Sequence, residues 1–319
     1  MTYSKGLSDL GNGNYAYLQP DGSWGYSNAG LVTDSGESLL VDTLFDLRLT
    51  AEMLETMRRA EPAAERIGTL VNTHANGDHC YGNQLIQGAR VVTSAATAQE
   101  LEEITPAMLH AMATAPAGDN QALAFFQEAF GAFDFGGIEV PPPDETFSGE
   151  TTRRVGNKEV RLIEVGPAHT RGDVLVHVPA DRTLFTGDIL FIDGTPIVWA
   201  GPIDNWIRAC ERIAAMDLDH IIPGHGPLTD QEGVLQVGDY LAYIRDAARD
   251  RFDAGLSARE AAWDIPLDSY ADWLDSERIV VNVATLYREF GDTAPPPTTI
   301  DLFEGMGAYA TDRGRRTSR

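Results

Sequence analysis

Four of the seven histidines lie in short loops that follow apolar, strand-like runs of residues. These loops read THANGDH, GPAHTRGD and PGHGP; one aspartate lies in the first loop and another ends the segment TLFTGD. Imidazole and carboxylate groups are the ligands that zinc and related divalent ions take in catalytic sites. Loops at strand ends hold such ligands rigidly, so the pattern predicts a metal site. The candidate metal ligands are His74, Asp78, His79, His169, Asp188 and His225.

The first loop differs from the zinc motif in which two histidines share one face of a helix. His74 and His79 are five residues apart, and Gly77 lies between them. In the helical motif H-E-x-x-H the two histidines are four residues apart. We therefore expect this segment to be a loop that wraps around the ion.

The order and spacing of these residues resemble those of the metallo-β-lactamase superfamily. The chain carries T-H-x-N-x-D-H, then a lone histidine, an aspartate after T-G, and a final P-G-H-G. The segment LLVDT also matches, because the family places an acidic residue at this strand end, here Asp42. The resemblance covers roughly residues 15–230. It implies an αββα sandwich with a one- or two-metal centre at the edge of the sheets.

The resemblance also implies a role for each candidate ligand. One set of residues would hold a first metal, a second set would hold a second metal, and one carboxylate would bridge them. These are, in turn, His74 with His169, Asp78 with His79 and His225, and Asp188. We predict that Asp42 supports the centre through a strand-end cap or a hydrogen bond rather than as a ligand.

Asn76 stands where the family usually has the second histidine of its H-x-H-x-D-H motif. An amide oxygen is a neutral and weaker donor than imidazole, so the first metal position loses a good ligand. Three outcomes stay open: a single zinc ion at Asp78, His79 and His225, two ions of which the first is labile, or another metal such as iron or manganese. We expect zinc, as one ion or two.

A metal ion held in this way predicts hydrolysis. Bound divalent ions lower the pKa of water toward about 7 and polarise a carbonyl oxygen. Asp78 or Asp188 would orient the nucleophile and move a proton, and Asn76 would donate a hydrogen bond to a substrate oxyanion. We therefore expect a metal-dependent hydrolase in which metal-bound hydroxide attacks the ester, thioester, lactone or amide carbonyl of a small molecule.

Two other functions stay open. The superfamily also supplies polyketide cyclases and thioesterases to biosynthetic pathways, and aromatic residues near the centre would suit such substrates. Alternatively, the chain is a non-catalytic binding protein whose metal is only structural. Arg171 would pair a substrate carboxylate or form a surface ion pair. The candidate substrate contacts are Trp24, Tyr26, Trp199 and Arg171.

Several segments must fold together to bring these loops to one place. Strand and helix patterns alternate over residues 1–230, which we assign to the sandwich domain. Helical spacing at about 95–135 predicts an insert of two or three helices that could cover the site. Residues 231–293 predict a helical C-terminal extension. Residues 294–319 begin with a Pro-rich linker, and we expect an extended arm there that could dock on a neighbouring subunit of a homodimer.

The composition narrows the class of partner. The 319 residues include 48 acidic and 24 basic side chains, and the formal charge of -24 repels nucleic acids. No apolar run approaches the roughly 20 residues that cross a bilayer, and the N-terminus lacks the features of a signal peptide. Cys80 and Cys210 are predicted to be buried free thiols. We expect a soluble cytoplasmic protein that acts on a small molecule, with no nucleic-acid or membrane partner.

Overall fold

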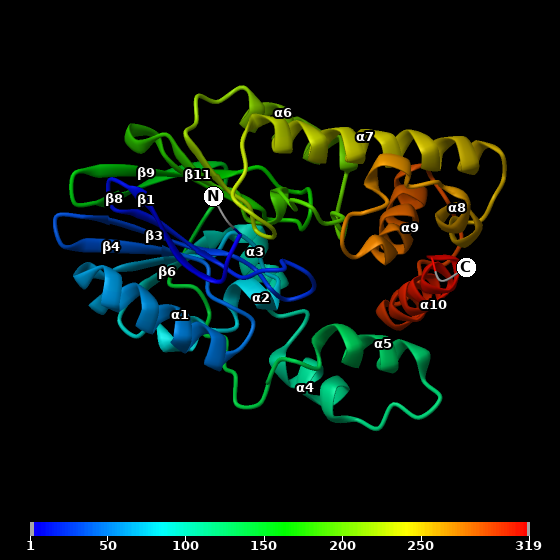
Figure 1. Cartoon of the computed structure of the whole chain (residues 1–319), viewed down its shortest axis with the longest axis horizontal. Helices are drawn as coiled ribbons and strands as arrows, with labels where there is room; N and C mark the ends of the chain where they lie inside the picture. The colour runs from blue at the N-terminus through cyan, green and yellow to red at the C-terminus, as the bar shows by residue number, and fades with distance from the viewer. Residues whose placement is uncertain (1–2, 318–319) are drawn as a thin grey trace.

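Two β-sheets pack face to face between layers of helices in the computed structural model, which describes residues 3–317 (Figure 1). The strand order is β1-β2-β3-β4-β5-β6-β7 in the larger sheet and β12-β11-β10-β9-β8 in the smaller sheet. The larger sheet comprises β1 (Gly6–Gly11), β2 (Asn14–Leu18), β3 (Ala29–Asp34), β4 (Glu37–Val41), β5 (Thr69–Val71), β6 (Arg90–Ser94) and β7 (Glu145–Phe147). The smaller sheet comprises β8 (Glu150–Val155), β9 (Lys158–Glu164), β10 (Val174–Val178), β11 (Thr183–Phe185) and β12 (His220–Ile222).

Both faces of each sheet are apolar, because successive side chains of a strand point in opposite directions. In β4, Leu39 and Val41 belong to the core between the sheets, whereas Leu40 belongs to the core beneath the helices. In β10, Val174 belongs to the core between the sheets and its neighbour Leu175 belongs to the core beneath the helices. Each sheet therefore packs on its partner with one face and on helices with the other. The predicted αββα sandwich is confirmed.

Helices cover the outer faces of the sandwich. The helix α1 (Leu47–Ala60) lies over the larger sheet, and α6 (Ile203–Ala214) lies over the smaller sheet (Figure 1). The carboxylate of Asp46 caps α1 by accepting a 2.7 Å hydrogen bond from the backbone N–H of Leu49. The indole N–H of Trp206 on α6 donates to the carbonyl of Ile189, 2.9 Å away, so α6 is tied to the loop after β11.

Further helices lie within and after the sandwich sequence. Between β6 and β7 the chain forms α3 (Ala95–Glu100), α4 (Pro106–Thr114) and α5 (Gln121–Phe130). After β12 it forms α7 (Gln231–Asp253), α8 (Ala258–Asp264), α9 (Ile279–Glu289) and α10 (Thr299–Thr317). Helices therefore occur in both segments for which helical spacing predicts them. Among the described residues, none of the helices combines the length and the apolar character needed to cross a membrane.

The expected extended arm at residues 294–319 is wrong for Thr299–Thr317, which form α10. Phe303, Met306 and Tyr309 are buried at three-residue intervals, so they form one apolar face of a helix. This face packs against α5 and α9 of the same chain. Gly307 lowers helix propensity, but a Cβ there would lie 2.9 Å from Phe125 Cβ, so glycine allows the close approach of α10 to α5.

Candidate metal centre

The candidate ligands lie at the ends of parallel strands. Asp42 follows β4 and His74 follows β5, and these two strands are parallel neighbours in the larger sheet. Asp188 follows β11 and His225 follows β12, which are parallel neighbours in the smaller sheet. The ends of parallel strands meet at one edge of a sheet, so both sheets bring their loops to the same place. His169 joins them from the loop before β10.

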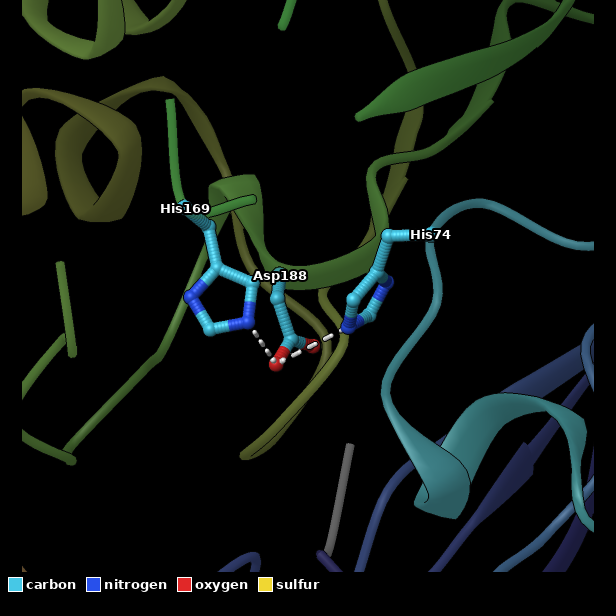
Figure 2. A group of neighbouring side chains, drawn as sticks. All are labelled: His74, His169 and Asp188. Carbon is cyan, nitrogen blue, oxygen red and sulfur yellow. Dashed lines mark ion pairs between the residues drawn. The ribbon is translucent and has the colours of Figure 1, made fainter. Parts of the chain in front are cut away.

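The first cluster consists of His74, His169 and Asp188, all buried (Figure 2). The Nε2 atom of His74 lies 3.6 Å from Oδ2 of Asp188, and the Nε2 atom of His169 lies 3.4 Å from the same oxygen. One potential ligand atom from each residue lies within 4.8 Å of the other two. The three side chains therefore point at a common space, as the resemblance implies for the first metal and the bridging carboxylate.

The second cluster consists of Asp78, His79 and His225, which are also buried. The Nε2 atoms of His225 and His79 lie 3.2 Å and 3.9 Å from Oδ2 of Asp78. Asp188 reaches this cluster too, because its Oδ1 lies 3.0 Å from His79 Nε2 and its Oδ2 lies 3.4 Å from His225 Nε2. Asp188 thus lies between the two clusters, where a bridging ligand would lie.

Buried polar atoms at the centre fit a cation. Among the described residues, Nε2 of His74, Nε2 of His79 and Oδ1 of Asp188 are buried without a hydrogen-bond partner. The last two atoms lie only 3.0 Å apart, but they do not count as hydrogen-bonded by geometry. Burying such atoms unpaired is costly, and a divalent cation bound by imidazole and carboxylate would satisfy them. The donor set is that of a zinc-type site.

Each imidazole is held from outside through its Nδ1 atom. His169 donates from Nδ1 to the carbonyl of Ile197 at 2.7 Å, and His225 donates to the carbonyl of Gly22 at 3.1 Å. A carbonyl oxygen can only accept, so in both rings Nδ1 carries the proton. His79 Nδ1 lies 3.0 Å from the carboxylate of Asp42. The Nε2 atoms of these rings are therefore left to face the centre.

Asp42 organises the neighbouring loop as well. Its Oδ1 accepts from the backbone N–H of Thr73, and its Oδ2 accepts from the Thr73 hydroxyl, each at 2.7 Å. Because that hydroxyl donates to Asp42, it accepts from Nδ1 of His74 at 3.0 Å. The carboxylate therefore lies behind two of the imidazoles and orients them. This is the supporting role that we predict for Asp42.

Electrostatics divides the histidines into two kinds. Burial lowers the pKa of His74 well below its ordinary value and lowers that of His169 to about 4, so both imidazoles are neutral at pH 7. Burial also opposes the charged form of His79 and His225, but Asp188 outweighs it in each. The pKa of His79 is held well above its usual range, and that of His225 is raised to about 9. The second cluster therefore carries the stronger field of carboxylates.

Asn76 faces the first cluster. Its Nδ2 lies 3.1 Å from Nε2 of His169, and it stands at the N-cap of α2 (Gly77–Cys80) without using its side chain as a cap. The predicted loop is thus in part a single helical turn, in which the N–H of His79 donates to the carbonyl of Asn76. This turn presents Asp78 and His79 to the second cluster. Cys80 and Cys210 are buried free thiols, as predicted.

The candidate substrate contacts are occupied by other parts of the protein. The ring of Trp24 packs edge-on against Phe130 of the insert, with centroids 5.5 Å apart, and Tyr26 packs on Phe133 at 5.0 Å. The guanidinium of Arg171 pairs with Glu100 at 3.0 Å and also with Glu103, so the alternative of an ion pair describes its surroundings.

Trp199 lies closer to the centre. Its backbone N–H donates to the carbonyl of His169 at 3.1 Å, and its side chain is partly buried. A substrate role for Trp199 and for the other candidates stays a prediction.

Residues that hold the imidazoles from outside were not predicted from the sequence, apart from Asp42. Thr73 precedes His74 directly, so its place beside a ligand is the one available signal. The carbonyls of Gly22 and Ile197 act through the backbone, which carries no residue-specific signal. Asn282 contacts the segment around Ile197 from the helix α9, and its only mark in the sequence is a polar residue within the apolar run IVVNVA.

The layered fold and the clustered histidines and aspartates define a protein of the metallo-hydrolase class. A sequence profile described as the metallo-beta-lactamase superfamily matches residues 22–225, and the chain therefore belongs to this superfamily. The predicted resemblance is confirmed.

Sequence relatives carry the names of hydrolases. The human protein "Acyl-coenzyme A thioesterase MBLAC2" is 26% identical over 217 residues, which are 62% of this chain and 72% of that protein. The "Hydroxyacylglutathione hydrolase" of Methylococcus capsulatus is 28% identical over 151 residues, or 47% of this chain and 44% of that protein.

Solved structures show the same fold. The sec-alkylsulfatase Pisa1 from Pseudomonas sp. superposes with a TM-score of 0.66 at 16% identity. The superposition covers 91% of this chain, which spans about half of the sulfatase (50%). A metallo-beta-lactamase from Pontibacter korlensis has a TM-score of 0.54 at 20% identity and covers 75% of this chain and 99% of its own. These likenesses support the fold alone.

Proposed function

We propose that this protein is a metal-dependent hydrolase of small-molecule thioesters. The observation that carries the proposal is the ring of buried imidazoles whose Nδ1 atoms are bonded outward and whose Nε2 atoms converge on the Asp188 carboxylate. Such an arrangement suits a cation held by fixed donors. The relatives named as acyl-coenzyme A thioesterase and hydroxyacylglutathione hydrolase support a thioester over the ester, lactone and amide alternatives.

The residues that would hold metal are those of the two clusters. His74, His169 and Asp188 would hold one ion, and Asp78, His79 and His225 would hold the other. A divalent ion supplies Lewis acidity there, which makes water more acidic and polarises a carbonyl oxygen. Zinc fits the mixture of imidazole and carboxylate donors, with one ion or two.

The carboxylates are suited to proton transfer. Burial opposes ionisation of Asp78 and Asp188, but the neighbouring imidazoles outweigh it and lower the pKa of both carboxyls. Both are therefore ionised at neutral pH, and Asp78 can take a proton from water as the new C–O bond forms. The same proton can then pass to the sulfur when the C–S bond breaks. A thiol leaves more readily than an amine, because its pKa is about 8.5.

Asn76 is suited to stabilising the carbonyl oxygen. Its amide lies at the first cluster, 3.1 Å from His169 Nε2, and its N–H groups can donate to a substrate oxygen that becomes negative. In this proposal, the residue that weakens the metal site also supplies a hydrogen-bond donor at the position where charge develops.

The test combines metal analysis with thioester assays. Freshly purified wild-type protein, Asp78→Ala and His169→Ala are compared for metal per chain and for release of free thiol from acyl-coenzyme A and acylglutathione substrates. We expect both variants to bind less metal and to lose at least about 100-fold in turnover. His177→Ala is the matched control, because His177 lies on β10 outside both clusters.

Two results would reject the proposal. One is a chelator-treated sample that keeps its full rate, because hydrolysis would then not need the metal. The other is a metal-loaded wild-type protein that releases no thiol from either substrate, which would favour the non-catalytic binding protein instead.

A further inference from the structure

Asn282 is a fully buried amide on α9, in the C-terminal extension. Its Oδ1 accepts from the backbone N–H of Val198 at 2.7 Å, and its Nδ2 donates to the carbonyl of Pro196 at 2.8 Å. The same Nδ2 lies 3.3 Å from the hydroxyl of Tyr240 on α7. Asn282 therefore fixes the backbone on both sides of Ile197.

The carbonyl of Ile197 is the acceptor for Nδ1 of His169, at 2.7 Å. The backbone N–H groups of Trp199 and Ala200 also donate to the carbonyl of His169, each at 3.1 Å. A second residue of α9, Thr285, donates from its hydroxyl to the carbonyl of Val198 at 2.8 Å. The segment 196–200 is thus bonded to α9 on one side and to His169 on the other.

A similar connection reaches His225 from the η6 turn (Ser276–Arg278) and the residue before it. Asp275 accepts from the hydroxyl of Ser23 at 2.7 Å, and the neighbouring carbonyl of Gly22 is the acceptor for Nδ1 of His225 at 3.1 Å. Arg278 forms an ion pair with Asp275 at 2.9 Å.

Arg278 also reaches His225 through an aromatic ring. Its buried guanidinium lies 4.2 Å from the ring centroid of Trp24 and 5.2 Å from that of Phe191. The ring of Phe191 stacks on the imidazole of His225 with an interplanar angle of 3°. The turn that carries Gly22 and the ring behind His225 are therefore both held by the C-terminal extension.

We propose that the C-terminal helical extension is a positioning element of the metal centre. Asn282 acts as the positioning residue for His169, in the first cluster, and Asp275 acts as the positioning residue for His225, in the second. Both residues lie outside residues 22–225, which match the family profile, so this support belongs to the part of the chain beyond that match. Replacing either side chain leaves buried backbone or hydroxyl groups without their partners, and the acceptor carbonyl shifts.

The first test is the tautomer of the imidazoles in metal-free protein. Long-range proton–nitrogen NMR spectra of protein labelled with ¹⁵N-histidine distinguish a proton on Nδ1 from one on Nε2. We expect Nδ1–H for both His169 and His225 in the wild type, because each donates to a carbonyl. Asn282→Ala is expected to give a mixture at His169 and no change at His225, and Asp275→Ala is expected to give the reverse.

The second test is zinc affinity, measured by competition with a chelator. We expect each variant to weaken one ion by about tenfold or more, which is the usual cost when the group orienting a ligand is lost. Val283→Ala is the control, because Val283 is a fully buried neighbour on α9 that contributes to the core. Its loss of packing should lower stability without changing either tautomer.

The proposal is overturned if Asn282→Ala leaves the His169 signal unchanged, or if Val283→Ala changes it equally. If Asn282→Ala does not fold, Thr285→Val replaces it with the same criterion, because it removes only one bond to Val198. Because the proposal rests on the metal-centre function proposed above, the two must be separable. Zinc content and thiol release in the wild type test the function, whereas the tautomers in metal-free protein test the positioning.

Discussion

A fixed tautomer is what makes four separate imidazoles usable as one donor set. Nδ1 is engaged in all four rings, by Ile197, Gly22, Asp42 and the Thr73 hydroxyl. A neutral imidazole has one lone pair, and the outward bond directs it through Nε2. The ligand geometry therefore depends on residues that would not themselves touch an ion.

Asp42→Asn tests this dependence. The amide cannot accept at both positions, so the bonds to His79 and Thr73 compete and the two imidazoles lose their orientation. We expect zinc affinity to fall by about 10- to 100-fold in a chelator competition. Asp46→Asn is the matched control, since Asp46 is equally buried, caps α1, and asparagine also caps helices well. Equal losses in the two variants would argue against the supporting role.

Asn76→His separates metal binding from oxyanion stabilisation. An imidazole at this position, beside His169, is a stronger donor than the amide, so we expect more zinc per chain by elemental analysis. If Asn76 donates to the substrate oxygen, turnover per bound metal falls by about 100-fold. A variant with restored metal and unchanged or faster turnover would show that the amide has no such role.

Residue type and spacing were sufficient to predict the six residues that the structure brings together. Histidines and aspartates are few in apolar loop contexts, and the T-H-x-N-x-D-H pattern restricts them further. The outer acceptors could not be predicted in this way. Ile197 and Gly22 contribute backbone carbonyls, so their place depends on tertiary structure and not on their side chains.

The strands and outer helices followed local patterns, but α10 did not. The sandwich strands alternate or run apolar, and α1 has a capping aspartate and one apolar face, all of which are local signals. The sequence of α10 contains Gly305 and Gly307 and follows a Pro-rich segment, which favours an extended chain. Its helix is stabilised by contact with α5 and α9, which are distant in the sequence.

Phe303→Ala tests the docking of α10. Phe303 is buried and contacts Phe125, Phe126 and Phe130 of α5, with ring centroids 5.7 to 6.3 Å apart. We expect the free energy of unfolding to fall by about 3 kcal/mol in urea denaturation. Ile300→Ala on the same helix is the control, because Ile300 is 60% exposed and should cost less than about 0.5 kcal/mol. Similar values for both variants would mean that α10 does not pack on the insert.

The insert and the C-terminal extension together form a second layer around the sandwich. Trp24, on the turn that also carries Gly22, contacts Phe130 of α5 with one side and donates from its indole N–H to Glu277 at 2.7 Å. Phe303 of α10 packs on the same Phe130. The turn beside His225, the insert and the extension are therefore one connected structure, and disturbing any of them is expected to reach the centre.

The overall charge of -24 makes a further prediction about thioester substrates. Coenzyme A esters carry several negative charges, so the field of the protein slows their approach at low salt. The Debye length falls from about 30 Å at 0.01 M salt to about 8 Å at 0.15 M, and the repulsion is then screened. We expect kcat/KM for an acyl-coenzyme A to rise several-fold over this range. A neutral thioester with the same acyl group is the control, and its kcat/KM should stay constant. A fall with salt for the coenzyme A ester alone would instead indicate a local cationic site that attracts the substrate despite the net charge.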